Sequence, residues 1–147
     1  MSTAARLPMP PRSTLARLLE RTPVRRIMRP GVVSVAGNAS LLQVADAMSA
    51  HGVHAILVLD AHSSSPAGWV NSAALLERLL EYSPFEPAAA AITEEPLCIV
   101  PSASVADAVH TLAGSDVTHL LVTPGPTAAP QGVISDTDII RFAASRA

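Results

Sequence analysis

The sequence has no lysine, one cysteine and few aromatic residues. Because Cys98 is the only cysteine, one chain can form neither an internal disulfide nor a multi-cysteine zinc or iron–sulfur site. Aromatic residues make up 3% of the chain, too few for a surface of interleaved aromatic and basic side chains that binds single-stranded nucleic acid. No apolar run approaches the roughly 18 residues of a membrane-spanning helix. We therefore expect no membrane association and a cytoplasmic location.

Apolar residues are abundant in the 147-residue chain. They make up 49% of it, against 15% charged residues, which is enough to bury the core of one compact unit. The length leaves no room for a large two-domain enzyme. Nor does the sequence contain a nucleophile paired with a base, a glycine-rich phosphate loop or a pair of acid/base carboxylates. We expect no enzymatic activity, no metal site and no required cofactor.

Charge is unevenly divided along the chain. Residues 1–29 contain seven arginines and one acid, Glu20, for a net charge of +6, and residues 30–147 contain three arginines and eleven acids, for −8. A basic segment of this kind can dock on its own acidic body, on a second copy, or on an anionic partner. Short arginine-rich segments are weak signals, so a solvated tail and helix face is favoured and a nucleic-acid partner is not expected. Thr14 is predicted to cap a short amphipathic helix in this segment.

The sequence repeats itself at an offset of 64 residues. Without a gap, residues 32–77 align with 96–141, and apolar positions such as Met48 and Leu112 recur in register. The identical pairs are Ala39 and Ala103, Ser40 and Ser104, Val53 and Val117, Leu57 and Leu121, Val58 and Val122, Pro66 and Pro130, and Gly68 and Gly132. Because an internal repeat decides the architecture, we interpret the chain as a tandem duplication.

Each copy is predicted to fold as strand, helix, strand, strand, helix. In the first copy Ser40 and Gln43 form a capping box that opens the first helix, and Ser104 caps the matching helix of the second copy. The strands are predicted at 32–35, 53–59 and 68–70, and at 97–100, 117–123 and 132–134. The expected division is a basic segment at 1–23, a first repeat at 24–81, a linker at 82–95 and a second repeat at 96–147.

Two motifs and the repeat together resemble a known family. Arg26-Ile27-Met28-Arg29-Pro30 precedes the first strand, and residues 132–141 read Gly-Val-Ile-Ser-Asp-Thr-Asp-Ile-Ile-Arg. In both copies Ala-Ser stands ahead of an apolar helix. Over residues 24–144 the chain resembles the paired cystathionine-β-synthase (CBS) domains, also called the Bateman module. Members often have an aspartate just ahead of the Ile-Met step, where this chain has Arg26.

The resemblance implies an α/β (α+β) fold of two βαββα repeats in a pseudo-two-fold arrangement. Between the repeats lies a cleft that in many members binds AMP, ADP, ATP or S-adenosylmethionine, and such pairs commonly form homodimers. By the family pattern Ser135, Thr137 and Asp138 contact the phosphate and ribose. His119 falls where members often place a basic side chain that reaches the phosphates. The resemblance also implies that the chain at about 28–32, up to Val32, contacts the base, largely through apolar or backbone groups.

Physical chemistry is compatible with this site, and also with a plainer interpretation. A helix that begins near Asp136 points free backbone N–H groups outward, which suits phosphate, and a carboxylate in its first turn can accept hydrogen bonds from ribose. Alternatively Ser135 is an ordinary N-cap and Asp138 its third-position carboxylate, together stabilising the helix by about 1 kcal/mol. His119 is equally interpretable as a half-buried strand residue.

The first copy lacks the implied binding residues. Ala74 stands in place of the carboxylate, Ala73 in place of the second hydroxyl residue, and Ala55 in place of His119. We therefore expect one ligand site per chain, built mainly on the second repeat. The predicted function is a stand-alone regulatory module that senses an adenosine-containing ligand and signals to an effector protein that the sequence does not identify. The alternative is a ligand-free scaffold for dimerisation and docking.

Overall fold

A computed structural model describes residues 13–125 and 128–145. The first twelve residues of the predicted basic segment lie outside the described residues. In chain order the elements are α1 Thr14–Arg21, η1 Val24–Arg26, β1 Arg29–Pro30, β2 Ser34–Ala36, α2 Leu41–His51, β3 Ala55–Leu59, β4 Pro66–Asn71, α3 Ser72–Glu81, η2 Ala88–Ala91, β5 Cys98–Ile99, α4 Val105–Ala113, β6 His119–Val122, β7 Gly132–Ser135 and α5 Asp136–Ser145.

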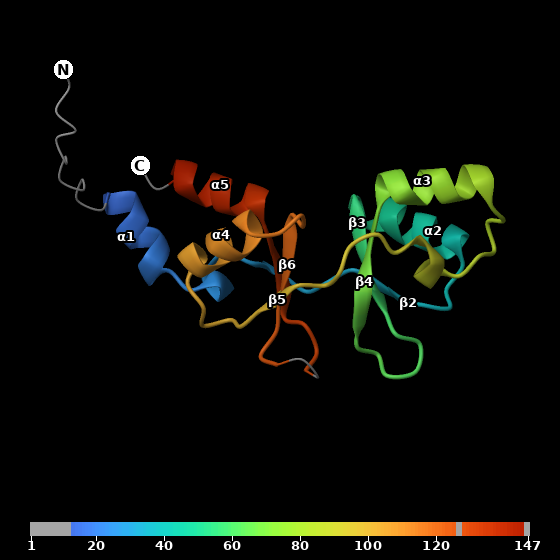
Figure 1. The fold of residues 1–147 in the computed structure, drawn as a ribbon, viewed down its shortest axis with the longest axis horizontal. Helices are drawn as coiled ribbons and strands as arrows, with labels where there is room; N and C mark the ends of the chain where they lie inside the picture. The colour runs from blue at the N-terminus through green and yellow to red at the C-terminus, as the bar shows by residue number, and fades with distance from the viewer. Residues whose placement is uncertain (1–12, 126–127, 146–147) are drawn as a thin grey trace, which may run out of the picture.

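The two predicted βαββα repeats are present and have the same topology. In the first, β2 runs parallel to β3 and β3 antiparallel to β4; in the second, β5, β6 and β7 repeat this pattern. Equivalent residues occupy equivalent places, because Ser34 pairs with Leu57 and Cys98, 64 residues later, pairs with Leu121. Figure 1 shows the two sheets facing each other at the centre of the molecule, with the helices of each repeat on the outside.

The segment that leads into each repeat crosses to the other repeat. We call residues 22–33 and 86–97 the lead-in segments. Val24 is fully buried in the core of the second repeat, and its N–H donates to Ala103 O at 2.8 Å. Its counterpart Ala88 is fully buried in the core of the first repeat, where its N–H donates to Ala39 O at 2.7 Å. The stretch expected as a plain linker, 82–95, thus contains η2, which fills part of the first core.

The exchange of lead-in segments joins the two sheets into one unit. Strand β1 belongs to the first lead-in segment but pairs antiparallel with β7, so the sheet of the second repeat has four strands in the order β1-β7-β6-β5. The close approach requires glycine at one position in each repeat. A Cβ at Gly132 would collide with Arg29 O, and a Cβ at Gly68 would collide with Ile92.

Hydrophobic side chains form a core in each repeat and a smaller cluster between the sheets. The first core lies between the sheet β2-β3-β4 and its helices, and the second lies between β5-β6-β7 and α4 and α5. The third cluster consists of Leu57, Trp69 and Leu121, one or two residues from each sheet. It therefore holds the two repeats against each other.

The helix starts follow the predicted caps with one exception. Capping boxes form between Ser40 and Gln43 at α2 and between Ser104 and Asp107 at α4. The prediction that Thr14 caps α1 is wrong, because Ser13 Oγ accepts the N–H of Ala16 at 3.0 Å and Thr14 is already helical. Helix α1 packs beside α4 of the second repeat (Figure 1). Within 13–125 and 128–145, no helix has the length and apolar character needed to cross a bilayer.

Candidate functional site

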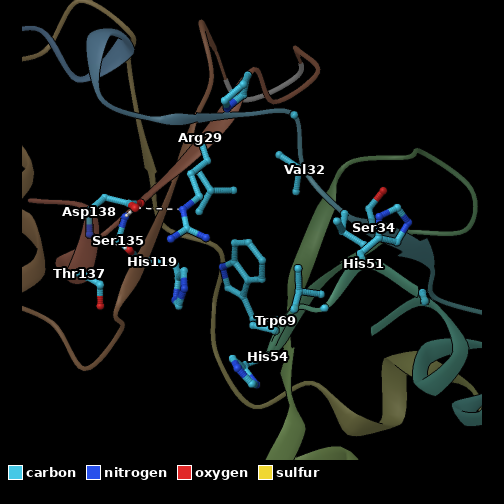
Figure 2. Close-up of a pocket in the computed structure, with 18 residues that line it drawn as sticks. Arg29, Val32, Ser34, His51, His54, Trp69, His119, Ser135, Thr137 and Asp138 are labelled. Carbon is cyan, nitrogen blue, oxygen red and sulfur yellow. Dashed lines mark hydrogen bonds and ion pairs between the residues drawn. The ribbon is translucent and has the colours of Figure 1, made fainter. Parts of the chain in front are cut away.

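A cavity of about 880 Å³ lies between the two repeats. Its wall comes from the first lead-in segment, from the end of α2, from β3 and β4, and from β6, β7 and the start of α5 (Figure 2). All five residues predicted from the sequence as ligand-binding line this cavity: Val32, His119, Ser135, Thr137 and Asp138. The structure thus brings together residues that are up to about a hundred positions apart in the chain.

The start of α5 carries both the predicted cap and the predicted ligand residues. Asp138 N–H donates to Ser135 Oγ at 3.2 Å, and Ser135 N–H donates to Asp138 Oδ2 at 3.0 Å, which is a capping box. The side chain of Asp138 is only 6% exposed, yet it lines the cavity. Ser135 and Asp138 therefore cap the helix, as the plainer interpretation expects. Both side chains also lie at the wall of the cavity.

The expectation of free backbone N–H groups at the start of α5 is wrong. Besides the bond from Asp138 N–H, the N–H of Asp136 donates to Thr118 O at 3.1 Å and the N–H of Thr137 donates to Asp136 Oδ1 at 2.7 Å. These local partners satisfy the groups that a phosphate would otherwise contact. Any anion in the cavity must be held mainly by side chains.

Sequence reasoning did not identify Arg29, whose side chain contacts Asp138, the carboxylate that is expected to bind ribose. Arg29 Nε donates to Asp138 Oδ1 at 3.0 Å, and Arg141 Nη1 lies 3.6 Å from the same oxygen. The Arg29 side chain is 63% exposed, and Figure 2 shows it pointing toward the neighbouring Asp138 on the same side of the cavity. The segment 28–32 was expected to offer apolar or backbone contacts, although the charge at position 29 was an available signal.

His119 and Trp69 meet where the two sheets face each other. Their rings lie 5.7 Å apart between centroids, at an interplanar angle of 41°. His119 is half-buried, and its Nδ1 lies 2.8 Å from Thr118 Oγ1. Trp69 is 4% exposed, and its indole Nε1 is buried without a hydrogen-bond partner among the described residues. A buried donor without a partner, in a residue that lines the cavity, is suited to a ligand acceptor.

Arg29 and Asp138 are the two formally charged residues among the described residues that line the cavity, and they are paired with each other. Three histidines, His51, His54 and His119, also line it and offer ring nitrogens to a polar ligand. Trp69 and Val32 add apolar surface. No group of three or more potential metal ligands comes together within 13–125 and 128–145.

Two βαββα repeats that exchange their lead-in segments around a shared cleft define a class of tandem-repeat modules. The CBS domain family matches this chain twice, at residues 24–81 and 88–145. The chain therefore belongs to the CBS domain family, and the sequence resemblance is confirmed. CBS pairs are regulatory modules. No curated protein sequence matches the chain.

Several solved structures share the fold at low sequence identity. The CBS domain of a bacterial CNNM/CorC family Mg²⁺ transporter in complex with ATP superposes with a TM-score of 0.78 at 20% identity, covering 90% of this chain and 94% of that one. CBSX2 in complex with AMP gives 0.67 at 19% identity, covering 84% and 96%. The CBS domain of a membrane protein from Sphaerobacter thermophilus gives 0.73 at 20% identity, covering 86% and 91%. These likenesses show the CBS-pair fold.

Proposed function

We propose that this chain is a regulatory CBS pair that binds an adenosine-containing ligand in the cavity between its repeats and transmits the occupancy of that cavity to an effector protein. The observation that carries the proposal is the convergence of Ser135, Thr137, Asp138 and His119 on one cavity. Its volume of about 880 Å³ lies within the usual range of small-molecule sites. Similar structures that hold ATP and AMP support this ligand class.

Each part of such a ligand has a matching group in the cavity. Asp138 is the acceptor for the ribose hydroxyls, and Thr137 and His119 are donors for the phosphates. Val32 and Trp69 supply apolar surface for the base. The proposed role is binding without catalysis.

Occupancy changes the molecule because the cavity wall belongs to both repeats and to a lead-in segment. A ligand that contacts the first lead-in segment and the start of α5 together favours the arrangement in which these parts are closest. Since η1 of the same segment is buried in the second core, a shift at β1 also reaches α1 and its arginines. We propose this basic surface as the output of the module toward an effector.

We also propose a homodimer, as the family resemblance implies. Large apolar side chains are exposed on the outer helices: Leu76 and Leu80 on α3, and Ile140 on α5. A second copy that covers them would remove this surface from water. Light scattering of the purified protein tests this proposal, and a monomer at micromolar concentration contradicts it. The cytoplasmic location stays a prediction.

Thermal unfolding with AMP, ADP, ATP and S-adenosylmethionine tests the binding proposal. A ligand at about 100 times its dissociation constant stabilises the native state by about 2.7 kcal/mol, which raises the midpoint by several degrees. Asp138→Ala should lose this shift. Asp107→Ala is the matched control, because Asp107 closes the same kind of capping box on α4 outside the cavity, with Asp107 Oδ2 3.1 Å from Ser104 N. It should be less stable but should keep the full ligand shift.

The alternative function, a ligand-free scaffold for dimerisation and docking, makes the opposite prediction. In that case none of the four ligands moves the midpoint, and Asp138→Ala behaves like Asp107→Ala. The capping box at Ser135 and Asp138 is the observation that favours this alternative, because it gives both residues a structural task.

A further inference from the structure

Both oxygens of the Asp138 carboxylate already have partners inside the chain. Oδ2 accepts the N–H of Ser135 at 3.0 Å, and Oδ1 accepts Arg29 Nε at 3.0 Å. A ribose needs this carboxylate to accept from its hydroxyls. Each oxygen can accept a second hydrogen bond, but the Arg29 side chain, itself part of the cavity wall, lies against Oδ1 and competes with a ribose hydroxyl for it. The carboxylate is therefore already in contact with a side chain of the first lead-in segment (Figure 2).

Arg29 is placed so that it can leave this position without disturbing the fold. Its backbone is held by the pairing of β1 with β7, where Arg29 lies opposite Val133, whereas its side chain is 63% exposed. When Arg29 leaves, Asp138 keeps its bond from Ser135 and the nearby Arg141, whose Nη1 is 3.6 Å from Oδ1. The buried carboxylate is thus never without a positive neighbour, which lowers the cost of releasing Arg29.

The cavity offers little else that holds a phosphate strongly. The first N–H groups of α5 have local partners, and His119 Nδ1 lies 2.8 Å from Thr118 Oγ1. Among the described residues that line the cavity, Arg29 is the one arginine, and a guanidinium forms the strongest hydrogen bonds to phosphate. A phosphate next to the start of α5 would lie beside the carboxylate that Arg29 now contacts.

We propose that Arg29 competes with the ribose for Asp138 and moves to the phosphate when a 5′-phosphorylated adenosine binds. This inference rests on the proposed function and narrows its ligand class to anionic nucleotides. Adenosine must displace Arg29 and offers it no new partner, and the sulfonium of S-adenosylmethionine adds a positive charge beside it. A nucleotide also displaces Arg29 from Asp138, but its phosphate then pairs with the Arg29 guanidinium. The new ion pair with the phosphate replaces the one that the ribose has broken.

Calorimetric titration of Arg29→Met with adenosine and with ADP tests the proposal, because the substitution should change the affinities for the two ligands in opposite directions. Methionine keeps a long side chain but removes the charge and the donors. ADP should bind about 10- to 100-fold more weakly, which is the range for a lost hydrogen bond to a charged group. Adenosine should bind several-fold more tightly, because nothing competes for Asp138.

Two further variants separate this role from a general effect of charge. Arg141→Met removes the other arginine near Asp138 Oδ1, which does not line the cavity. Because Arg141 stays beside the carboxylate when Arg29 leaves, its loss should weaken adenosine and ADP by a similar factor of up to about five, not in opposite directions. Arg29→Lys keeps a positive charge and should restore part of the ADP affinity while adenosine stays weak. Unfolding curves without ligand identify any variant that has failed to fold.

The outcomes distinguish this inference from the proposed function. If Arg29→Met weakens adenosine and ADP by the same factor, or strengthens both, Arg29 does not exchange ribose for phosphate and the inference is overturned. If wild type binds ADP and Arg29→Met binds both ligands as wild type does, the inference fails and the proposed function stands. If neither protein binds adenosine, AMP, ADP or ATP, both fail together.

Discussion

The two repeats share their backbone, but their equivalent sites differ at almost every side chain that could hold a ligand. His119 pairs with Ser135 across β6 and β7, and 64 residues earlier Ala55 pairs with Asn71 across β3 and β4. Thr137 and Asp138 correspond to Ala73 and Ala74, which bring neither a hydroxyl nor a carboxylate. Duplication therefore kept the scaffold in both halves and the binding groups in one.

Charge separates the two sites further. In the lead-in segments, Pro30 and Gly31 at the cavity correspond to Glu94 and Glu95, and Arg29 corresponds to Thr93. An acidic pair at the equivalent position repels the phosphates that the arginine side attracts. The comparison teaches that the residues that maintain the fold and the residues that bind a ligand differ. Substitutions that affect the fold should therefore have similar effects on stability in both halves, whereas substitutions at the ligand site should affect binding in one half only.

The largest effect is expected at the two glycines where the lead-in segments pass. Gly132→Val forces a side chain into Arg29 O and Met28, and Gly68→Val forces one into Ile92 and Glu94 O. Each should lower the free energy of unfolding by about 3 kcal/mol, measured by urea denaturation. A large loss at one glycine and none at the other would contradict the structural equivalence of the halves.

His119→Ala should weaken ADP binding about three- to tenfold, because one hydrogen bond to the phosphate is lost. The fluorescence of Trp69, the single tryptophan, serves as the reporter, since its ring lies beside His119. His110→Ala is the control: His110 is exposed on α4 and does not line the cavity. If both variants bind ADP equally well, His119 is a packing residue, as its counterpart Ala55 is.

The sequence predicted the βαββα order and the capping residues because these depend on local patterns and on self-similarity. The five lining residues of the cavity that were predicted came from the resemblance to the CBS family. That resemblance also implied that the chain near 28–32 reaches the site on the second repeat, but the exchange of both lead-in segments was not predicted. Val24 and Ala88 are equivalent, but the sequence around each residue does not indicate which of the two similar apolar cores it enters. Arg29 was missed for a related reason, since it is 109 positions from Asp138 and their ion pair exists only once β1 joins β7.

The first helices of the two repeats offer a stability test of their equivalence. Ser40 Oγ accepts Gln43 N–H at 3.1 Å, and Ser104 Oγ accepts Asp107 N–H at 3.0 Å. Ser40→Ala and Ser104→Ala should each cost about 1 kcal/mol of unfolding free energy and leave ligand affinity unchanged. A change in ADP affinity in either variant would mean that these caps act on the cavity from a distance.

The smallest effect, and the most direct comparison of the two sites, is expected from thiol labelling at equivalent positions. Ser34 lines the cavity, whereas its counterpart Cys98 does not. Partial burial raises the pKa of the Cys98 thiol, so less thiolate is present at neutral pH and its alkylation should be slow and accelerate as the pH rises. ADP should leave this rate unchanged.

In a Ser34→Cys, Cys98→Ser double variant, ADP should instead slow labelling of the introduced thiol several-fold. Because each rate is compared with and without ADP at one pH, the different reactivities of the two thiols cancel. Protection of Cys98 would mean that the acidic first-repeat side also binds nucleotide, which would remove the asymmetry on which the single-site proposal depends.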